Sequence, residues 1–292
     1  MPPTLRIPDM IAEAGVSVRL ADCEVLADFL AAHQRVVVLT GAGCSTGSGI
    51  PAYRDGDGRW LQRRPILYPD FIAHAHVRRR YWARSYFGWP VMGQAFPNGA
   101  HHALAALERR GMVESVITQN VDGLHRRAGQ RNLVELHGRL DRVACLDCGR
   151  VESRDKLQRR LADINPDWTG RVLGINADGD AELDANDWPG FSVVECGACY
   201  GRLKPEVVFF GESLPTATRD AIQRTLAGAD AVLAVGTSLV VGSAFRLVRE
   251  AADRGLPVVA INQGRTRADR LLSFKVQGDC VEVLGNLARA LT

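Results

Sequence analysis

The sequence predicts an α/β fold, in which a Rossmann-like, doubly wound parallel sheet is interrupted by a small cysteine-rich module. Short β-branched runs alternate with longer amphipathic stretches, a pattern typical of βαβ units. The strongest of these runs, residues 35–40, leads directly into a glycine-rich turn. Residues 141–204 break the alternation with two Cys-x-x-Cys pairs. We therefore expect a helix-covered sheet with one insertion.

The expected elements follow one another in the order that a parallel sheet requires. The first half gives a helix at 20–33, a strand at 35–40, a helix at 98–110 and a strand at 113–119. After the cysteine-rich stretch come a strand at 207–210, a helix at 216–227, a strand at 231–235, a helix at 243–254 and a strand at 257–262. The strands are continuously apolar, which indicates that helices cover both of their faces.

Length and composition narrow the class of protein. The 292 residues suffice for one large domain and one smaller module. A net charge of only +3 points to neither nucleic acid nor a membrane as partner. No apolar run reaches the ~20 residues of a membrane span, and the first twenty residues lack the features of a signal peptide. Four of the seven cysteines are spaced as metal ligands instead of as a disulfide framework, which predicts a cytoplasmic location.

The glycine-rich turn, residues 40–47, follows the first strand and suits close approach of a pyrophosphate to the backbone. Its spacing is GxGxxxG and not the GxGxxG fingerprint. An acidic ribose partner ~20 residues on is also not evident. An ordinary tight turn is the alternative at this stage.

The two knuckles, Cys145 with Cys148 and Cys196 with Cys199, each suit a turn that aims two thiolates at one tetrahedral Zn²⁺. A redox Cys-x-x-Cys is the alternative. Four thiolates close a zinc site, so we expect one structural zinc per chain. We assign residues 141–204 to this zinc-binding module, and residues 1–140 and 205–292 to a dinucleotide-binding domain.

An acidic segment lies between the knuckles. It contains Asp178, Asp180, Glu182, Asp184 and Asp187. It does not fit an EF-hand, because Leu183 stands at the sixth position and no glutamate closes the loop. We expect a solvated surface loop.

Polar residues gather where a strand is expected to end. Residues 118–125 read TQNVDGLH, and His137 follows immediately before the module. In a doubly wound sheet the carboxyl ends of the strands line the ligand crevice. A surface or capping histidine is the alternative to a catalytic role for His137.

Together these motifs resemble the sirtuin family of NAD-dependent protein deacylases. The matching segments are residues 41–54, 118–125, 136–138, 204–212, 235–241 and 261–264, with both knuckles, in family order. Residues 80–90 and 141–149, with the long loop between the knuckles, look most like the class II branch, typified by the mitochondrial lipoamidase-type sirtuin of animals.

The resemblance implies that the acyl-lysine oxygen attacks the nicotinamide ribose of NAD, giving nicotinamide, O-acyl-ADP-ribose and free lysine. By similarity, His137 acts as general base, Asn120 positions the ribose and Asp122 binds the carboxamide. A histidine suits this role because its ordinary pKa, about 6.5, lies near working pH. The implied cofactor-binding residues are Gly41, Ala42, Gly43, Ala52, Tyr53, Arg54, Gln119, Asn120, Val121, Asp122, Gly236, Thr237, Ser238, Asn262, Gln263, Gly264 and Cys280.

The implied partner is an acyl-lysine side chain of a protein, bound as an extended peptide between residues 208–211 and 239–242. Val208, Phe210, Gly211 and Val241 are its expected contacts, with ordinary strand core as the alternative for Val208 and Phe210. Tyr81 and Arg84 share the Tyr-x-x-Arg spacing of sirtuins that remove acidic acyl groups. We therefore advance the hypothesis that these two side chains bind an acyl carboxylate, against a helix-surface arginine over a core tyrosine.

Two positions depart from the family pattern. Ala52 replaces a frequent acidic residue, and Cys44 replaces a frequent β-branched one; oxidation or simple packing of the Cys44 thiol are both open. Protein mono-ADP-ribosyl transfer from the same site is an alternative function that shares every motif. A non-catalytic NAD-responsive module and a hydride-transferring dehydrogenase fit the residues less well.

Overall fold

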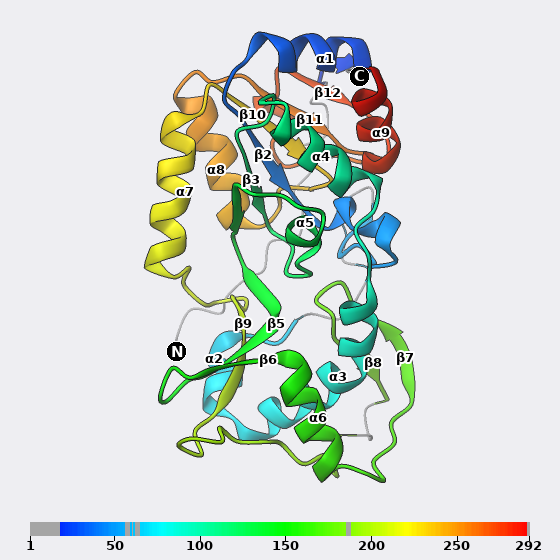
Figure 1. Cartoon of the computed structure of the whole chain (residues 1–292), viewed down its shortest axis with the longest axis vertical. Coiled ribbons are helices and arrows are strands. Elements are labelled where there is room, and N and C mark those ends of the chain that lie inside the picture. The colour runs from blue at the N-terminus through cyan, green and yellow to red at the C-terminus, as the bar shows by residue number, and fades with distance from the viewer. Residues whose placement is uncertain (1–17, 56–58, 60, 62–64, 185–187, 291–292) are drawn as a thin grey trace.

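The large lobe is built on a seven-stranded sheet in which every neighbouring pair is parallel (Figure 1). The computed structural model describes residues 18–55, 59, 61, 65–184 and 188–290. The strand order is β1-β12-β11-β10-β2-β3-β4. The strands are β1 Leu20–Ala21, β2 Val36–Thr40, β3 Ser115–Thr118, β4 Leu133–Glu135, β10 Ala231–Val235, β11 Val258–Ile261 and β12 Phe274–Val276. The predicted doubly wound sheet is confirmed, and its order reverses between β2 and β10.

Helices cover both faces of this sheet. One face carries α1 Cys23–Ala32, α4 Gly99–Arg109 and α9 Cys280–Ala290, and the other carries α7 Thr216–Gly228 and α8 Gly242–Asp253. Strand β2 shows why its sequence is continuously apolar: Val36 and Val38 enter the first core, while Val37 and Leu39 enter the second. Alternate side chains of one strand point to opposite faces, so a strand buried on both sides must be apolar throughout.

Two expectations need correction, and two elements were not expected. The first helix begins only at Cys23, because Leu20–Ala21 pairs with β12 and the Asp22 carboxylate caps the helix by accepting from the backbone N–H groups of Glu24 and Val25. The strand expected at 207–210 is instead β9, Leu203–Val207, and it leaves the main sheet to pair with the small lobe. Elements β12 and α9 were not predicted, since β12 has three residues and carries the charged Lys275.

The small lobe combines the cysteine-rich module with two helices from an earlier part of the chain (Figure 1). Its elements are α2 Tyr68–Ala73, α3 Ala75–Gln94, β5 Gly138–Cys145, β6 Val151–Ser153, α6 Arg154–Ile164, β7 Val172–Ile175, β8 Ala181–Leu183 and β9. Phe71 and Trp82 are fully buried in the same core as Val143, Leu157 and Phe191. Residues 68–94, which the sequence placed with the large domain, therefore pack with the module. No helix in the described ranges is both long and apolar enough to cross a membrane.

Four short elements complete the fold. They are α5 Leu124–Arg127 and the 3₁₀ helices η1 Ala42–Cys44, η2 Thr46–Ser48 and η3 Asp269–Leu271. Two of them, η1 and η2, form the connection that leaves the carboxyl end of β2.

The acidic segment is not simply a solvated loop. It forms the β7–β8 hairpin, which packs against α3 (Figure 1). Asp180 is buried at 3% exposure, whereas Asp184 is exposed, and Asp187 lies outside the described residues. The hairpin approaches α3 so closely that a Cβ at Gly88 would lie 1.8 Å from the Gly179 carbonyl oxygen. The hairpin can therefore pack against α3 in this position only when residue 88 is a glycine.

Replacing Gly88 with alanine tests this contact. We expect Gly88→Ala to lower the free energy of unfolding by ~1–3 kcal/mol, because the added methyl displaces backbone. The matched control is Gly93→Ala on the exposed face of the same helix, whose nearest neighbour is a side-chain atom at 3.4 Å. That variant should be neutral or more stable by up to about 1 kcal/mol. Chemical denaturation measures both, and equal effects would contradict the close approach.

Candidate active site and metal centre

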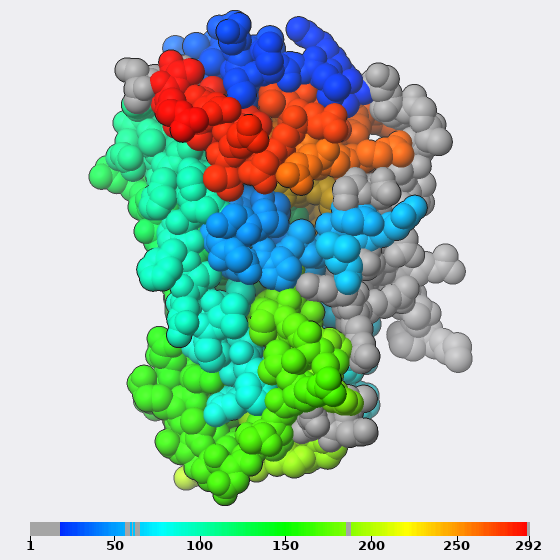
Figure 2. Space-filling model, turned by 90° about the vertical axis from the view of Figure 1, so that its right-hand side faces the viewer, coloured from blue at the N-terminus to red at the C-terminus, as the bar shows by residue number. Residues whose placement is uncertain are grey.

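A cavity of about 730 Å³ opens at the carboxyl ends of β2 and β10, where the strand order reverses. Figure 2 shows the segment that follows β2, in blue, between the C-terminal part of the large lobe and the small lobe. Every expected cofactor-binding residue except Asp122 lines this cavity. His137 and all expected substrate residues except Arg84 line it as well.

The backbone segments that follow β2 and β10 meet where the strand order reverses. The Gly43 amide donates to the Gly236 carbonyl oxygen at 2.9 Å, and the Gly41 amide donates to the Val235 carbonyl oxygen at 3.0 Å. A Cβ at Gly43 would lie 2.8 Å from the Gly236 oxygen, and one at Gly41 would lie 2.7 Å from the Thr237 Cβ. Side chains are therefore excluded at both glycines, which leaves bare backbone at the cavity, as a pyrophosphate site requires.

Asn120, Ser45 and Asp122 form a chain of hydrogen bonds beside the glycines. Asn120 Nδ2 donates to the Gly41 carbonyl oxygen at 3.0 Å and to Ser45 Oγ at 2.9 Å. Ser45 Oγ donates in turn to Asp122 Oδ2 at 2.7 Å, while Asp122 Oδ1 accepts from the Leu124 amide. Burial raises the pKa of Asp122, against these hydrogen bonds, which lower it. Neither Asp122 nor Ser45 lines the cavity, and the chain of hydrogen bonds reaches the cavity wall at Asn120. The expected contact between Asp122 and the carboxamide stays a prediction.

His137 has one defined tautomer. Its Nδ1 lies 3.0 Å from the Gln119 carbonyl oxygen, which can only accept, so Nδ1 carries the proton. Nε2 is then the basic nitrogen and accepts from Ser243 Oγ at 2.9 Å. Burial lowers the pKa of His137, and the bond to Gln119 acts in the opposite direction. The imidazole is therefore neutral at pH 7, with its lone pair at the cavity wall.

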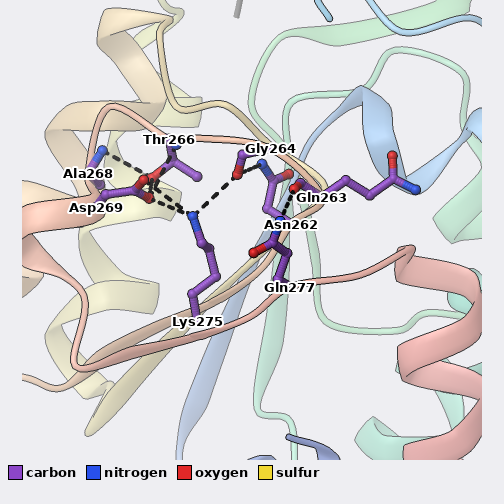
Figure 3. A network of polar contacts seen from close by, with 8 residues as sticks. All are labelled: Asn262, Gln263, Gly264, Thr266, Ala268, Asp269, Lys275 and Gln277. Atoms are coloured by element: carbon purple, nitrogen blue, oxygen red, sulfur yellow. Dashed lines mark hydrogen bonds and ion pairs between the residues drawn. The ribbon is translucent and has the colours of Figure 1, made fainter. Parts of the chain in front are cut away.

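The 262–264 loop is fixed by a buried lysine (Figure 3). Lys275, on β12, donates through Nζ to the Gly264 carbonyl oxygen at 3.3 Å and pairs with Asp269 at 3.3 Å. Asn262 Nδ2 donates to the same Gly264 oxygen at 3.0 Å. Lys275 was not expected from the sequence. It lies between the apolar residues Phe274 and Val276 in a buried strand, and a buried charge in such a place needs a partner.

The expected peptide-binding segment is held from the small lobe. The Val208 amide donates to the His137 carbonyl oxygen at 2.8 Å. The Phe209 amide donates to Glu212 Oε2 at 2.8 Å, and the same oxygen pairs with Lys204 Nζ at 2.9 Å. Lys204 is buried, which lowers its pKa, while Glu212 acts to raise it. Val208, Phe210, Gly211 and Val241 thereby form part of the cavity wall.

The structure places only one of Tyr81 and Arg84 at the cavity. Tyr81 lines the cavity, but Arg84 does not. Arg84 Nε donates to the Ala181 carbonyl oxygen at 2.9 Å, and its guanidinium lies 4.0 Å from Asp180 and 3.8 Å from Glu182. Binding of an acyl carboxylate by this pair stays a prediction, which would require Arg84 to leave these partners. Asp178 and Asp180, expected in solvent, line the cavity instead.

Two of the three cysteines outside the knuckles, Cys44 and Cys280, are buried in the large lobe. Cys44 is fully buried, and burial raises its pKa well above the ordinary value. Burial likewise raises the pKa of Cys280, which lines the cavity, to about 12. Neither thiol is a ready nucleophile for oxidants, because the reactive species is the thiolate. Packing is the role that the structure gives Cys44.

The four knuckle cysteines converge on one point. Their ligand atoms all lie within 4.8 Å of one another, with Cys145 and Cys199 Sγ atoms 3.5 Å apart and Cys148 and Cys196 Sγ atoms 3.8 Å apart. Zinc–sulfur bonds of 2.3 Å in a tetrahedron separate sulfurs by about 3.8 Å. Backbone amides of Asp147 and Ala198 donate to Cys145 and Cys196, as is usual for metal-bound thiolates. The residues therefore fit a closed structural zinc site.

Several residues that line the cavity were not expected from the sequence. Ser243 touches the expected base, and Asp178 and Asp180 reach the wall from the insertion. Ser243 stands at the start of a predicted helix that follows a glycine, a place where polar side chains often face a ligand. No local pattern marked the two aspartates, because their burial depends on α3, about ninety residues earlier.

Comparison with known proteins agrees with this geometry. The Sir2 family model matches residues 41–243. A protein of Bradyrhizobium diazoefficiens named NAD-dependent protein deacetylase 2 is 51% identical over 262 residues, covering 90% of this chain and 96% of that protein. A Bordetella bronchiseptica protein named NAD-dependent protein deacetylase is 50% identical over 272 residues, covering 92% and 98%.

Solved structures with a similar fold include members of the same family. One, described as Sir2 with p53 peptide and NAD⁺, superposes with a TM-score of 0.74 at 30% identity, covering 92% of this chain and 98% of that one. Another, described as a Sir2 homologue in complex with NAD, gives a TM-score of 0.72 at 31% identity, with 94% and 96% covered.

Removing one knuckle thiolate tests the metal centre. We expect Cys196→Ser to reduce bound zinc from about one per chain to near none and to lower the melting temperature, because a structural zinc contributes folding free energy directly. Elemental analysis and thermal unfolding measure the two effects. Cys23→Ser, outside the cluster, is the control and should keep its zinc. A zinc-loaded Cys196→Ser protein of unchanged stability would contradict the assignment.

Proposed function

The chain belongs to the Sir2 family, and we propose that its cavity performs the reaction for which its relatives are named, NAD-dependent deacetylation of proteins. The enzyme is an NAD-dependent protein deacylase of the sirtuin family. The main support for this proposal is His137. It lines the cavity, it is neutral, and its hydrogen bond to the Gln119 carbonyl oxygen fixes its tautomer with Nε2 as the basic nitrogen.

The cofactor-binding residues expected from the sequence are proposed as the NAD site. Residues 41–43 and 236–238 line one side of the cavity, and residues 262–264 line another. The polar, side-chain-free backbone at the sheet reversal supports a dinucleotide there. When bound, NAD supplies the ribose carbon to which the acyl oxygen bonds as nicotinamide leaves.

The protein's own residues then move one proton and exclude water. Nε2 of His137 accepts a proton from a ligand hydroxyl that takes the place of Ser243 Oγ, while Nδ1–H remains on the Gln119 carbonyl and holds the ring. Asn120, tied to Gly41 and Ser45, orients the sugar, and Asp122 keeps Ser45 in place. Tyr53 and Phe210 at the wall shield the reacting centre from solvent.

We propose that the protein substrate binds as an extended strand between residues 208–211 and 239–242, with its acyl-lysine entering the cavity beside Val208, Phe210 and Val241. Structures described as Sir2 with an acetylated peptide and with p53 peptide and NAD⁺ support a peptide as the class of substrate. The side chains of Val208 and Val241 supply an apolar wall, which suits the four-carbon stem of lysine.

Finer assignments rest on the sequence pattern. We propose that the chain is of the class II branch, since residues 80–90 and 141–149 carry that resemblance and the long inter-knuckle segment forms the β7–β8 hairpin. We keep residues 141–204 as the zinc-binding module within the NAD-binding domain. The cytoplasmic location stays a prediction from cysteine usage.

Mass spectrometry of a reaction with an acyl-lysine peptide tests the function. We expect free lysine, nicotinamide and O-acyl-ADP-ribose, whereas ADP-ribose attached to protein would favour the transferase alternative. His137→Ala should lower kcat/KM at least about 100-fold, the usual contribution of a general base. Calorimetric NAD binding and the melting temperature should change little. His102→Ala, at an exposed position of α4, is the matched control.

The pH dependence of kcat/KM tests the state of His137. Since burial lowers its pKa below the ordinary 6.5, the basic form persists through pH 6.5 and is lost only as the pH falls further. We expect a plateau through neutral pH with an acid limb centred below 6.5. An acid limb centred above 6.5 would mean that another group, or a protonated His137, controls the rate.

A further inference from the structure

The order of the strands gives the proposed dinucleotide site a direction. Across the sheet the order runs β11-β10-β2-β3-β4. Asn120 and His137, which are expected at the reacting ribose, follow β3 and β4, and the side-chain-free backbone expected at the pyrophosphate follows β2 and β10. Residues 262–265 line the cavity after β11, on the other side of that backbone. A dinucleotide that spans the reversal with one ribose at His137 therefore has its adenosine ribose at residues 262–265.

Residues 262–265 offer no carboxylate to the adenosine ribose, since their sequence is Asn-Gln-Gly-Arg. In dinucleotide sites that select NAD, a carboxylate accepts a hydrogen bond from the 2′-hydroxyl of this ribose, and the same negative charge repels a 2′-phosphate. The chain also has no acidic residue at 60–69, about twenty residues after the glycine-rich turn, where the dinucleotide fingerprint has one. The group that normally excludes NADP⁺ is therefore missing from both places.

Arg265 lines the cavity where such a carboxylate is missing. It is half-buried, in a loop that is fixed on both sides of it. Before it, the Gly264 carbonyl oxygen accepts from Lys275 Nζ at 3.3 Å, and after it, Thr266 Oγ1 donates to Asp269 Oδ1 at 2.7 Å (Figure 3). A planar guanidinium can bind a phosphate through two parallel hydrogen bonds, so an arginine on this loop suits a 2′-phosphate.

The carboxylates near this loop have partners of their own. Asp269 pairs with the buried Lys275 at 3.3 Å. Asp279 lines the cavity, but its Oδ1 accepts from a backbone N–H in the first turn of α9 at 2.8 Å, and Gln263 Nε2 donates to its Oδ2 at 3.4 Å. The positive end of the α9 dipole offsets part of the charge of Asp279. The adenosine end of the cavity therefore combines the Arg265 cation with carboxylates whose charge is compensated within the chain.

We propose that the cavity binds 2′-phosphorylated dinucleotides such as NADP⁺ at least as tightly as NAD⁺, and that Arg265 binds the 2′-phosphate. This inference rests on the proposed NAD site, because that site determines where the adenosine ribose lies. The 2′-phosphate is at the far end of the dinucleotide from the ribose carbon that reacts, so His137 and Asn120 meet the same half of either ligand.

Calorimetry of the wild-type protein with matched nucleotides tests the preference. The two pairs are NADP⁺ with NAD⁺, and 2′-phospho-ADP-ribose with ADP-ribose, and the members of a pair differ only in the 2′-phosphate. We expect the Kd of each phosphorylated member to be equal to that of its partner or lower by up to about tenfold, the effect of one charge-assisted hydrogen bond. Raising the NaCl concentration from about 0.05 M to about 0.5 M should weaken the phosphorylated member more than its partner, because salt screens the attraction between guanidinium and phosphate.

Substitution then assigns the preference to Arg265. Arg265→Ala should weaken binding of 2′-phospho-ADP-ribose about tenfold more than it weakens binding of ADP-ribose, since it removes the cation that pairs with the phosphate. Arg265→Lys keeps the charge without the two parallel hydrogen bonds, so its ratio should lie between those of wild type and Arg265→Ala. Arg270→Ala is the matched control and should keep the wild-type ratio, because Arg270 is exposed on the same connection between β11 and β12 and does not line the cavity.

The outcomes separate this inference from the proposed function. Weaker binding of either phosphorylated member than of its partner, in a protein that binds NAD⁺, would overturn the inference and leave the NAD site intact. A lack of deacylation by a protein that binds NADP⁺ at least as tightly as NAD⁺ would overturn the function alone. An Arg265→Ala protein that keeps the wild-type ratios, or a wild-type ratio that salt does not change, would remove Arg265 from the role. The wild-type comparison depends on no variant that has to fold.

Discussion

The contact between the backbone at Gly43 and the backbone at Gly236 determines most of what surrounds it. Two parallel strands, β2 and β10, end side by side there, and their chains then part to opposite faces of the sheet. The amide-to-carbonyl bond at 2.9 Å leaves no room for a Cβ at either glycine. Because the two turns are joined in this way, Asn120, which donates to the Gly41 carbonyl oxygen and to Ser45, has a fixed position at the cavity.

The small lobe depends on a second constraint, which is the joining of β5 to β9. His137 stands just before β5, and its carbonyl oxygen accepts from the Val208 amide just after β9. Gly138 has φ +80, and a Cβ there would lie 1.9 Å from the Glu206 carbonyl oxygen. The expected base and the expected peptide-binding segment are thus held side by side at one end of the β5–β9 pair. Cys145 lies at the other end of β5, so a zinc held by the knuckles would be connected to His137 only through this strand.

The sequence was informative where structure is set locally. A strand buried on both faces must be apolar at every residue, so β2, β10 and β11 could be recognised, and paired thiolates require knuckle spacing. It was uninformative where long-range contacts decide. Leu20–Ala21 is a strand only because β12 lies beside it, and Val208 and Phe209 resemble strand residues but serve as cavity wall. Asp180 was assigned to solvent, since charge in a turn-rich stretch is usually solvated, and only the arginines of α3 and α6 reverse that expectation.

The wall of the cavity is therefore supplied by two different parts of the chain. The groups proposed to hold NAD and move the proton come from the segments after β2, β3, β4, β10 and β11, all fixed by the parallel sheet. The acidic wall comes from a two-stranded hairpin that reaches the cavity only by resting on α3 at Gly88. Such a hairpin can change in sequence without altering the strand ends or the His137 turn. A fold with this division can keep the strand ends and the His137 segment unchanged while this part of the cavity wall varies.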